Sequence, residues 1–358
     1  MYSNKLIEVF LSLLRLGVGH HAYPLTSEIK WEGIMKLANN QGLDAVVLDG
    51  VEKLPLSSRP LRKFLLQWIG ETFQNYEYRY YAYERAIADM AKFYNSHGYK
   101  MMVLKGYACS LNWPKPEHRP CGDIDIWLFG DYKEADAVLK KEKGIEIDND
   151  RQHHTIFDWH GFMVENHFDF TDLHHHKSNV EIEKILKELG YKTTSCIDLH
   201  GEKVYIPSPN MHALFLLKHA MAHFAAEGMT LRQLLDWGFF VKAYTNEIDW
   251  DWLAGVIDKY GMTPAYNIFN AICVEDFGFD DAIFPDVQFN PILKDKVLND
   301  ILNPDFSGSL PKGLLPRVIY KVKRWRSNTW KHELCYNDSL WSAFWSGVWN
   351  HIRKPSTI

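Results

Sequence analysis

The sequence predicts an α+β protein in which a small mixed sheet with its helices lies between two helical regions. Three observations support this prediction. Apolar residues recur at helical spacing over 1–98, short β-rich runs alternate with turns over 99–207, and helical spacing resumes over 208–358. Strands mixed with helices in the middle of a chain are typical of an α/β or α+β unit. We therefore expect an N-terminal helical region, a core and a C-terminal helical region with these bounds.

The N-terminal region is expected to be mainly helical. Its first apolar run, residues 6–16, is interrupted by Glu8 and Arg15, and no small-residue cleavage site follows it. The run therefore predicts a packed helix rather than a signal peptide. Further helices are predicted over 31–39 and 61–97, where apolar and aromatic residues keep the helical spacing.

The core is expected to contain four strands and one helix. Strands are predicted over 101–104, 124–129, 162–168 and 203–206, and a helix over 131–143. In the C-terminal region, Ser208 is a suitable N-cap with Pro209 at the first helical position. Thr230 and Gln233 have the spacing of a capping box for the next helix.

Composition limits the function. The chain has 358 residues, 46% of them hydrophobic, and a net charge of −5, so it is a globular protein without a global positive field. A dedicated nucleic-acid-binding protein is disfavoured. Five cysteines without a C-x-x-C pair argue for a reducing compartment and against zinc ribbons, and a cytoplasmic enzyme is the simplest interpretation.

Two carboxylates lie two residues apart in one apolar run, at the start of a predicted strand. Asp is a poor strand former, yet Asp123 and Asp125 alternate with Ile124 and Ile126. Strand alternation puts both acids on one face, where their repulsion requires a shared proton or a divalent cation. Mg²⁺ suits such oxygen ligands and bridges to phosphates. The alternative is a pair at a strand edge that faces water.

A third acid, Glu165, lies in another β-like run and shares a face with His167. If its strand neighbours that of Asp123 and Asp125, the three carboxylates complete a site of the kind that holds two metals for phosphoryl displacement. We therefore expect Asp123, Asp125 and Glu165 to be both metal ligands and catalytic residues.

These residues resemble a known pattern. The segments that carry it are Leu104-Lys105-Gly106, Arg119-Pro120, Gly122-Asp123-Ile124-Asp125 and Glu165-x-His167. They look like a family of largely uncharacterised bacterial nucleotidyltransferases within the polymerase-β-like nucleotidyltransferase superfamily. The resemblance extends from Leu104 to about Asp236 and implies a polymerase-β-like core.

The resemblance also implies roles for single residues. Gly106 would let the backbone approach the phosphates of an NTP at a helix N-terminus, with Tyr107 beside it. Glu165 would hold the catalytic metal and help to deprotonate the acceptor hydroxyl. The superfamily usually has Gly-Gly or Gly-Ser at this turn, and here Lys105 and Arg119 would supply the missing positive charge. The alternative for both cations is solvation at the surface.

The C-terminal helices carry further candidates. His212, His219 and His223 share one helix face, but Ala220 stands where a zinc protease needs Glu. The resemblance implies that His219, Arg232 and Asp236 line the nucleotide cleft. Histidines packed in the core, and a structural ion pair between the last two residues, are the alternatives.

Two other clusters are left open. A zinc site is conceivable among histidines near Glu165, although their spacing is not diagnostic; they are His153, His154, His160 and His174 to His176. The tail has seven cations and no acid over 312–331, followed by Trp341, Trp345 and Trp349 at helical spacing. It predicts a packed terminal helix, or contact with a membrane surface or an acidic acceptor.

Together these observations predict a nucleotidyltransferase that moves an NMP from Mg-NTP to an acceptor hydroxyl and releases pyrophosphate. Mn²⁺ is the alternative metal, and ATP is the nucleotide that we expect first. The expected partners are the NTP and an acceptor that is a small molecule, a saccharide or a protein. The alternative function is a non-catalytic nucleotide-binding or antitoxin-like regulatory module.

Overall fold

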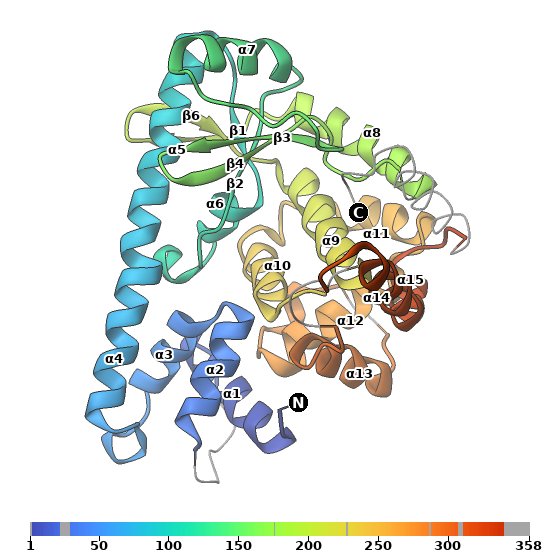
Figure 1. Ribbon diagram of the computed structural model, residues 1–358. Coiled ribbons are helices and arrows are strands. Elements are labelled where there is room, and N and C mark those ends of the chain that lie inside the picture. The colour runs from blue at the N-terminus through green and yellow to red at the C-terminus, as the bar shows by residue number, and fades with distance from the viewer. Residues whose placement is uncertain are drawn as a thin grey trace.

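The computed structural model describes residues 2–21, 29–174, 176–226, 228–285, 288–306 and 311–339. It has the predicted α+β architecture, a mixed sheet with helices before, around and after it (Figure 1). The predicted division of the chain at residues 98 and 207 stays a prediction. Among the described residues, no helix combines the length and the apolar character that are needed to cross a membrane.

The first apolar run forms a packed helix, as predicted. Helix α1 (Asn4–Gly17) buries Phe10, Leu13 and Leu14 completely against α2 (Trp31–Gln41) and α3 (Asp44–Glu52). The short helix η1 (Leu56–Ser58) follows. These helices share one hydrophobic core with the C-terminal helices, and a second core lies between the sheet, α5 and α7.

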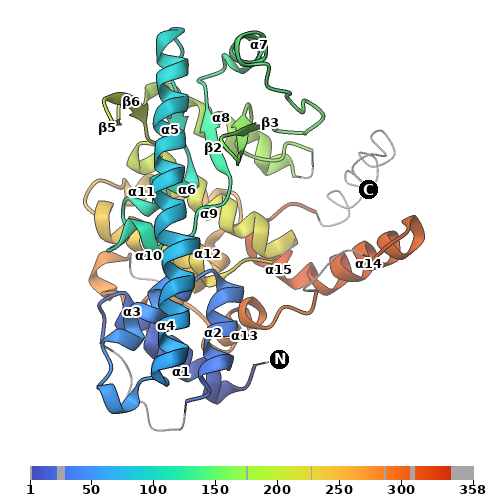
Figure 2. The same ribbon diagram turned by 60° about the vertical axis from the view of Figure 1, so that its left-hand side comes forward.

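The helix predicted over 61–97 consists of α4 (Arg62–Thr72) and α5 (Tyr78–Ser96), joined by the π-helical turn η2 (Phe73–Glu77). It runs along one side of the molecule from the N-terminal helices to the sheet (Figures 1 and 2). Tyr83, Ile87 and Met90 of α5 are buried under the sheet. This helix therefore supports the sheet from the face opposite α9.

The sheet has the strand order β3-β4-β2-β1-β6-β5. Its strands are β1 (Met102–Val103), β2 (Ile124–Trp127), β3 (His154–Trp159), β4 (Phe162–His167), β5 (Cys196–Leu199) and β6 (Glu202–Tyr205). β2 is parallel to β4 and antiparallel to β1, β1 is parallel to β6, and the two outer pairs are antiparallel hairpins. The helices between the strands are α6 (Lys105–Ser110), η3 (Pro116–His118), α7 (Tyr132–Lys143) and α8 (Lys177–Lys192).

The strands β3 and β5, the helix α8 and the short helix η3 were not predicted from the sequence. Each of the two missed strands pairs with its neighbour through a two-residue turn, His160-Gly161 or His200-Gly201. All four turn residues have positive φ, which type I′ hairpin turns require. Histidine is rare in this conformation, so the turns carry no Asn-Gly signal.

The two faces of β2 point into different surroundings. Ile124 and Ile126 are fully buried toward α5 and α7, whereas Trp127 packs toward α8 and α9. Side chains alternate between faces along a strand, so Asp125 lies on the same side as Trp127. The candidate carboxylates therefore face the C-terminal helices.

The C-terminal region is helical. It comprises α9 (Pro209–Ala226), α10 (Leu231–Tyr244), α11 (Trp250–Lys259), α12 (Thr263–Ala271), η4 (Ile272–Asp276), η5 (Asp281–Ile283), α13 (Pro291–Leu302), α14 (Leu314–Ser327) and α15 (Thr329–Cys335). The predicted capping box of Thr230 and Gln233 is present at α10. The helix predicted to start at Pro209 also starts there. Helix α14, which carries most of the basic tail, projects from the body (Figure 2).

Candidate active site

The structure brings two of the three candidate acids together on neighbouring strands. Asp125 of β2 pairs in register with Glu165 of β4, so the two carboxylates project side by side from one face of the sheet. His167, two residues further along β4, lies on the same face. Carboxylate oxygens of both acids and a ring nitrogen of His167 lie within 4.8 Å of one another.

Positive groups surround Asp125, whose side chain is only 3% exposed. The Lys105 Nζ lies 2.7 Å from Oδ1 of Asp125, and Nε2–H of His167 donates to the same oxygen at 2.9 Å. Burial disfavours the charged carboxylate, but Lys105 and His167 hold the pKa of Asp125 well below its ordinary value. Asp125 is therefore ionised and doubly compensated.

The pKa of His167 is raised, because its bonds to Asp125 and Glu165 outweigh the effect of burial. Its Nδ1 lies 3.2 Å from the carbonyl oxygen of Asp169, which only accepts hydrogen bonds. Both ring nitrogens thus donate. The imidazolium of His167 is a second fixed positive charge in the site.

Asp123 precedes β2 and lies outside the group of close ligand atoms. Its pKa is raised, first by burial and then by the negative charge of Asp125. Its carbonyl oxygen accepts a hydrogen bond from the Tyr83 hydroxyl at 2.8 Å. Tyr83, which sequence reasoning missed, therefore fixes the backbone that carries Asp123.

Gly106 sits in the first turn of α6, where the backbone passes close to Tyr83. A Cβ at Gly106 would lie 2.6 Å from the Tyr83 hydroxyl, so only glycine fits without displacing that ring. The next side chain, Tyr107, is buried and donates to Glu84 at 3.1 Å. Tyr107 therefore turns toward α5, and only its backbone is left to face a nucleotide.

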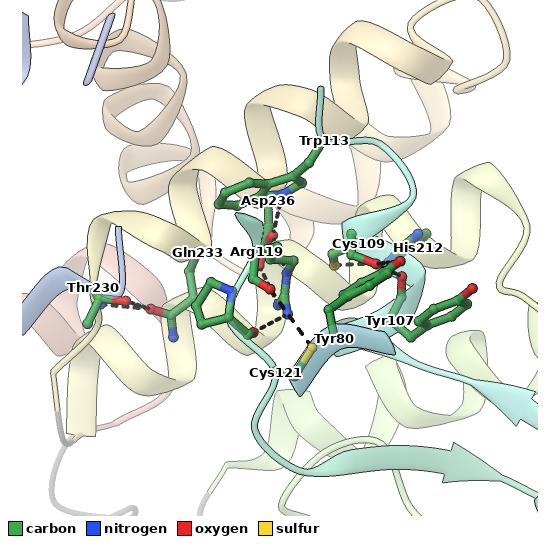
Figure 3. Close-up of polar contacts among 12 residues, drawn as sticks. Tyr80, Tyr107, Cys109, Trp113, Arg119, Cys121, His212, Thr230, Gln233 and Asp236 are labelled. Atoms are coloured by element: carbon green, nitrogen blue, oxygen red, sulfur yellow. Dashed lines mark hydrogen bonds and ion pairs between the residues drawn. The ribbon is translucent and has the colours of Figure 1, made fainter. Parts of the chain in front are cut away.

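The surface alternative for Arg119 is wrong, because its side chain is buried. Its Nε and one terminal nitrogen donate to the two carboxylate oxygens of Asp236 at 2.8 and 2.9 Å, and the other terminal nitrogen donates to the Pro120 carbonyl (Figure 3). Trp113 donates to Asp236 at 2.9 Å. The ion pair between Arg119 and Asp236 links the segment before Asp123 to α10. Lys105, in its pair with Asp125, is likewise not a solvated surface cation.

The alternative that Asp236 pairs with Arg232 is also wrong, since Asp236 pairs with Arg119. Arg232 has a buried Nε without a hydrogen-bond partner in the described part of the chain. Its pKa is lowered, first by burial and then by the charge of Arg119. Arg232 is thus a cation whose charge is only partly compensated.

The three histidines of α9 lie in two different surroundings. His219 and His223 stack edge to face at 4.4 Å between ring centroids, whereas His212 lies against Cys109 and Phe240. Burial and then the charge of Lys105 hold the pKa of His219 well below its ordinary value. His219 is therefore neutral and lies on the side of α9 that faces the carboxylates.

Two further histidines adjoin the site. His154 of β3 pairs across the hairpin with His167, and its Nε2 lies 3.7 Å from Glu165. Burial lowers the pKa of His153 to about 4, and burial also lowers that of His154. The missed strand β3 explains why the sequence did not place these two residues precisely against the carboxylates of Asp125 and Glu165.

The donor set fits a hard divalent cation. Asp125 and Glu165 present ionised oxygens on adjacent strands. Burial disfavours the charged carboxylate of Glu165, but His167, Lys105 and His154 together lower its pKa. Mg²⁺ and Mn²⁺ prefer such oxygen ligands. Lys105 occupies one oxygen of Asp125, so a cation at this position would compete with its ammonium.

Several sequence predictions fall elsewhere. His160 lies at the β3–β4 turn, bonded to Asp89, away from the carboxylates. Of the predicted histidine triplet, the structure describes His174 and His176, whereas His175 lies outside the described residues. The tryptophans 341, 345 and 349 lie outside the described residues, so their predicted stripe stays a prediction.

A parallel pair of strands that carries adjacent carboxylates, with a helix entered through Lys-Gly beside them, is the arrangement that the sequence resemblance implies for a nucleotidyltransferase core. A family model described as "Uncharacterised nucleotidyltransferase" matches residues 27–278. The chain belongs to this family. The match extends beyond the span from Leu104 to Asp236 on which the sequence resemblance rests. It includes helices that precede the sheet and helices that follow it in the chain.

Comparison with other proteins adds little detail. A search of curated proteins found no match. Among solved structures, the chain is similar to an antigenic nucleotidyltransferase-like protein from Paracoccidioides brasiliensis, with 14% identity and a TM-score of 0.34 over 56% of this chain and 95% of that one.

Proposed function

We propose that this protein transfers a nucleoside monophosphate from Mg-NTP to an acceptor hydroxyl and releases pyrophosphate. The observation that carries the proposal is the register of Asp125 against Glu165, which puts two ionised carboxylates on one face of the sheet. Family membership supports the class of reaction. Asp125 and Glu165 would hold the metal, with Asp123 as the third acid, and the metal would neutralise charge on the phosphates.

The other residues have separate tasks in this proposal. Arg232 binds the triphosphate, because its buried Nε has no hydrogen-bond partner among the described residues and its charge is only partly compensated. Glu165, the more exposed of the two paired acids, takes the proton of the acceptor hydroxyl. Gly106 lets the backbone of α6 approach the phosphates, and Lys105, which is paired with Asp125, would supply positive charge beside them. The acceptor is a small molecule, a saccharide or a protein.

The experiment is a labelling screen with the purified full chain, Mg²⁺ or Mn²⁺, each common NTP and a cell extract. We expect label from the α-phosphate to appear on an acceptor while pyrophosphate is released, and both to disappear with EDTA. Transfer of label from the γ-phosphate instead would identify a kinase and contradict the proposal. ATP is the first nucleotide to try.

A non-catalytic nucleotide-binding module is the second candidate. The observation that favours it is the double compensation of Asp125 by Lys105 and His167, which leaves this carboxylate satisfied without a metal. Calorimetry separates the two functions. Mg-dependent NTP binding with no turnover against any acceptor fraction would support the module, whereas pyrophosphate release supports the enzyme.

Arg232→Met gives a prediction in which stability and binding move in opposite directions. We expect NTP affinity to fall by about tenfold or more, since a charge-assisted phosphate contact contributes about 1.5–3 kcal/mol. We expect the free energy of unfolding to stay constant or to rise, because an incompletely compensated buried charge is removed. Calorimetry with Mg-NTP and urea unfolding measure the two effects.

Arg62→Met is the matched control, because Arg62 is exposed on α4 far along the chain from the site. It should change neither quantity. A loss of stability in Arg232→Met with unchanged NTP affinity would show that Arg232 supports the fold and does not bind nucleotide.

A further inference from the structure

Three histidines lie close together at the open end of the β3–β4 hairpin, beside the carboxylates. His154 and His167 are direct cross-strand partners, and such partners have Cβ atoms about 4.5–5.5 Å apart. His153 precedes β3, and its carbonyl oxygen accepts hydrogen bonds from the backbone N–H groups of Phe168 and Asp169 at 3.0 and 3.1 Å. The backbone therefore holds all three residues at one end of two paired strands.

The ring nitrogens of this histidine cluster (His153, His154 and His167) are close and incompletely bonded. One nitrogen from each ring lies within 4.8 Å of the others. The Nδ1 atoms of His153 and His154 are buried without a hydrogen-bond partner among the described residues, and the whole side chain of His154 is 8% exposed. Buried polar atoms are normally bonded, so two neighbouring exceptions require a reason.

We propose that the histidine cluster binds a late first-row divalent metal ion such as Zn²⁺, in addition to the cation of the carboxylates. Imidazole nitrogen is a ligand that Zn²⁺, Co²⁺ and Ni²⁺ favour, whereas Mg²⁺ favours oxygen. A tetrahedral site with Zn–N bonds of about 2.0–2.1 Å needs nitrogens about 3.3 Å apart. The ligand atoms already lie within 4.8 Å of one another, so a small change in side-chain torsion is what the site requires.

The nearest acid adjoins the cluster. Glu165 lies 3.7 Å from Nε2 of His154 and 3.5 Å from Nε2 of His167, so its negative charge favours a cation held by the three rings. His167 loses one ring proton, and the hydrogen bond that this proton makes, when it becomes a ligand. The proposal does not depend on nucleotidyl transfer, since it requires only that the three imidazoles bind a metal.

The test is a Co²⁺ titration of the tag-free, EDTA-treated full chain in the presence of excess Mg²⁺. Excess Mg²⁺ competes with Co²⁺ for the carboxylates, and the loss of Co²⁺ binding in the histidine variants assigns the remaining Co²⁺ to the histidine cluster. We expect the intense visible absorption of four- or five-coordinate Co²⁺, which Zn²⁺ displaces. His153→Asn and His154→Asn should weaken Co²⁺ binding by at least about tenfold to 100-fold, since even an outer-shell change has an effect of this size.

His160→Asn is the matched control, because this exposed histidine belongs to the same hairpin but bonds to Asp89 at 2.7 Å. It should bind Co²⁺ as the wild type does. Absence of Mg-resistant Co²⁺ binding, or equal binding in His153→Asn, overturns the proposal. If the variants fail to fold, X-ray absorption of the Zn-loaded wild type decides, and fewer than two imidazole ligands overturns it.

Discussion

Asp125→Asn is expected to reduce nucleotidyl transfer by about 10³-fold, which corresponds to about 4 kcal/mol of transition-state stabilisation. The amide keeps the shape of Asp125 but removes the charge that a metal requires. The pyrophosphate release rate with saturating Mg-NTP measures the effect. Asp258→Asn, an exposed change on α11, is the control and should leave the rate unchanged.

The single variant has a second effect, since Asp125 also neutralises Lys105. Removing one partner of a buried ion pair leaves an uncompensated charge and costs about 3–5 kcal/mol of stability. A second variant, Asp125→Asn with Lys105→Met, removes both charges of the pair. We expect it to recover stability in urea unfolding but not activity. Recovery of activity together with stability would show that Asp125 is a structural residue and would contradict its role as a metal ligand.

Local patterns in the sequence predicted the part of the site that lies on single strands. Alternation in Ile124-Asp125-Ile126 correctly separated the buried isoleucines from the acid, and it needed no knowledge of the neighbouring strand. The register of Asp125 against Glu165 could not be predicted in this way, because pairing between strands 40 residues apart depends on the whole sheet. Strand alternation over 162–168 singled out Glu165 as a candidate third acid, and the resemblance to a family added its role in deprotonating the acceptor hydroxyl.

The missed elements have physical explanations. The β3 and β5 strands end in turns with histidine at positive φ, a conformation that this residue seldom adopts, so no turn signal was visible. Helix α8 did carry a signal. Ile182, Ile185, Leu186 and Leu189 have the spacing of one helix face, and Ile182 and Leu186 are fully buried. That helix was predictable from its periodicity.

Arg119 shows where sequence reasoning fails for charged residues. The sequence left an ion pair between Arg232 and Asp236, four residues apart on one helix, as an alternative. The fold instead brings Asp236 to Arg119, 117 residues away. Buried charges pair with whatever the tertiary structure places beside them, so the exchange of partners could not be predicted from spacing.

Arg119→Met is therefore expected to lower the free energy of unfolding by about 3–5 kcal/mol, because the buried carboxylate of Asp236 keeps only its bond from Trp113. The midpoint and slope of a urea transition measure the loss. Arg119→Met combined with Asp236→Asn removes both charges and leaves an oxygen for the indole N–H of Trp113. This double variant should regain most of the lost stability.

The double variant also decides what Arg119 does for the nucleotide. All of its guanidinium nitrogens donate within the protein, to Asp236 and Pro120, which leaves it poorly placed to bind a phosphate as the family resemblance implies. If Arg119 only positions the segment before Asp123, the double variant binds Mg-NTP as tightly as the wild type. If it binds the triphosphate, affinity falls by about tenfold although stability is restored, because a charge-assisted contact is then missing.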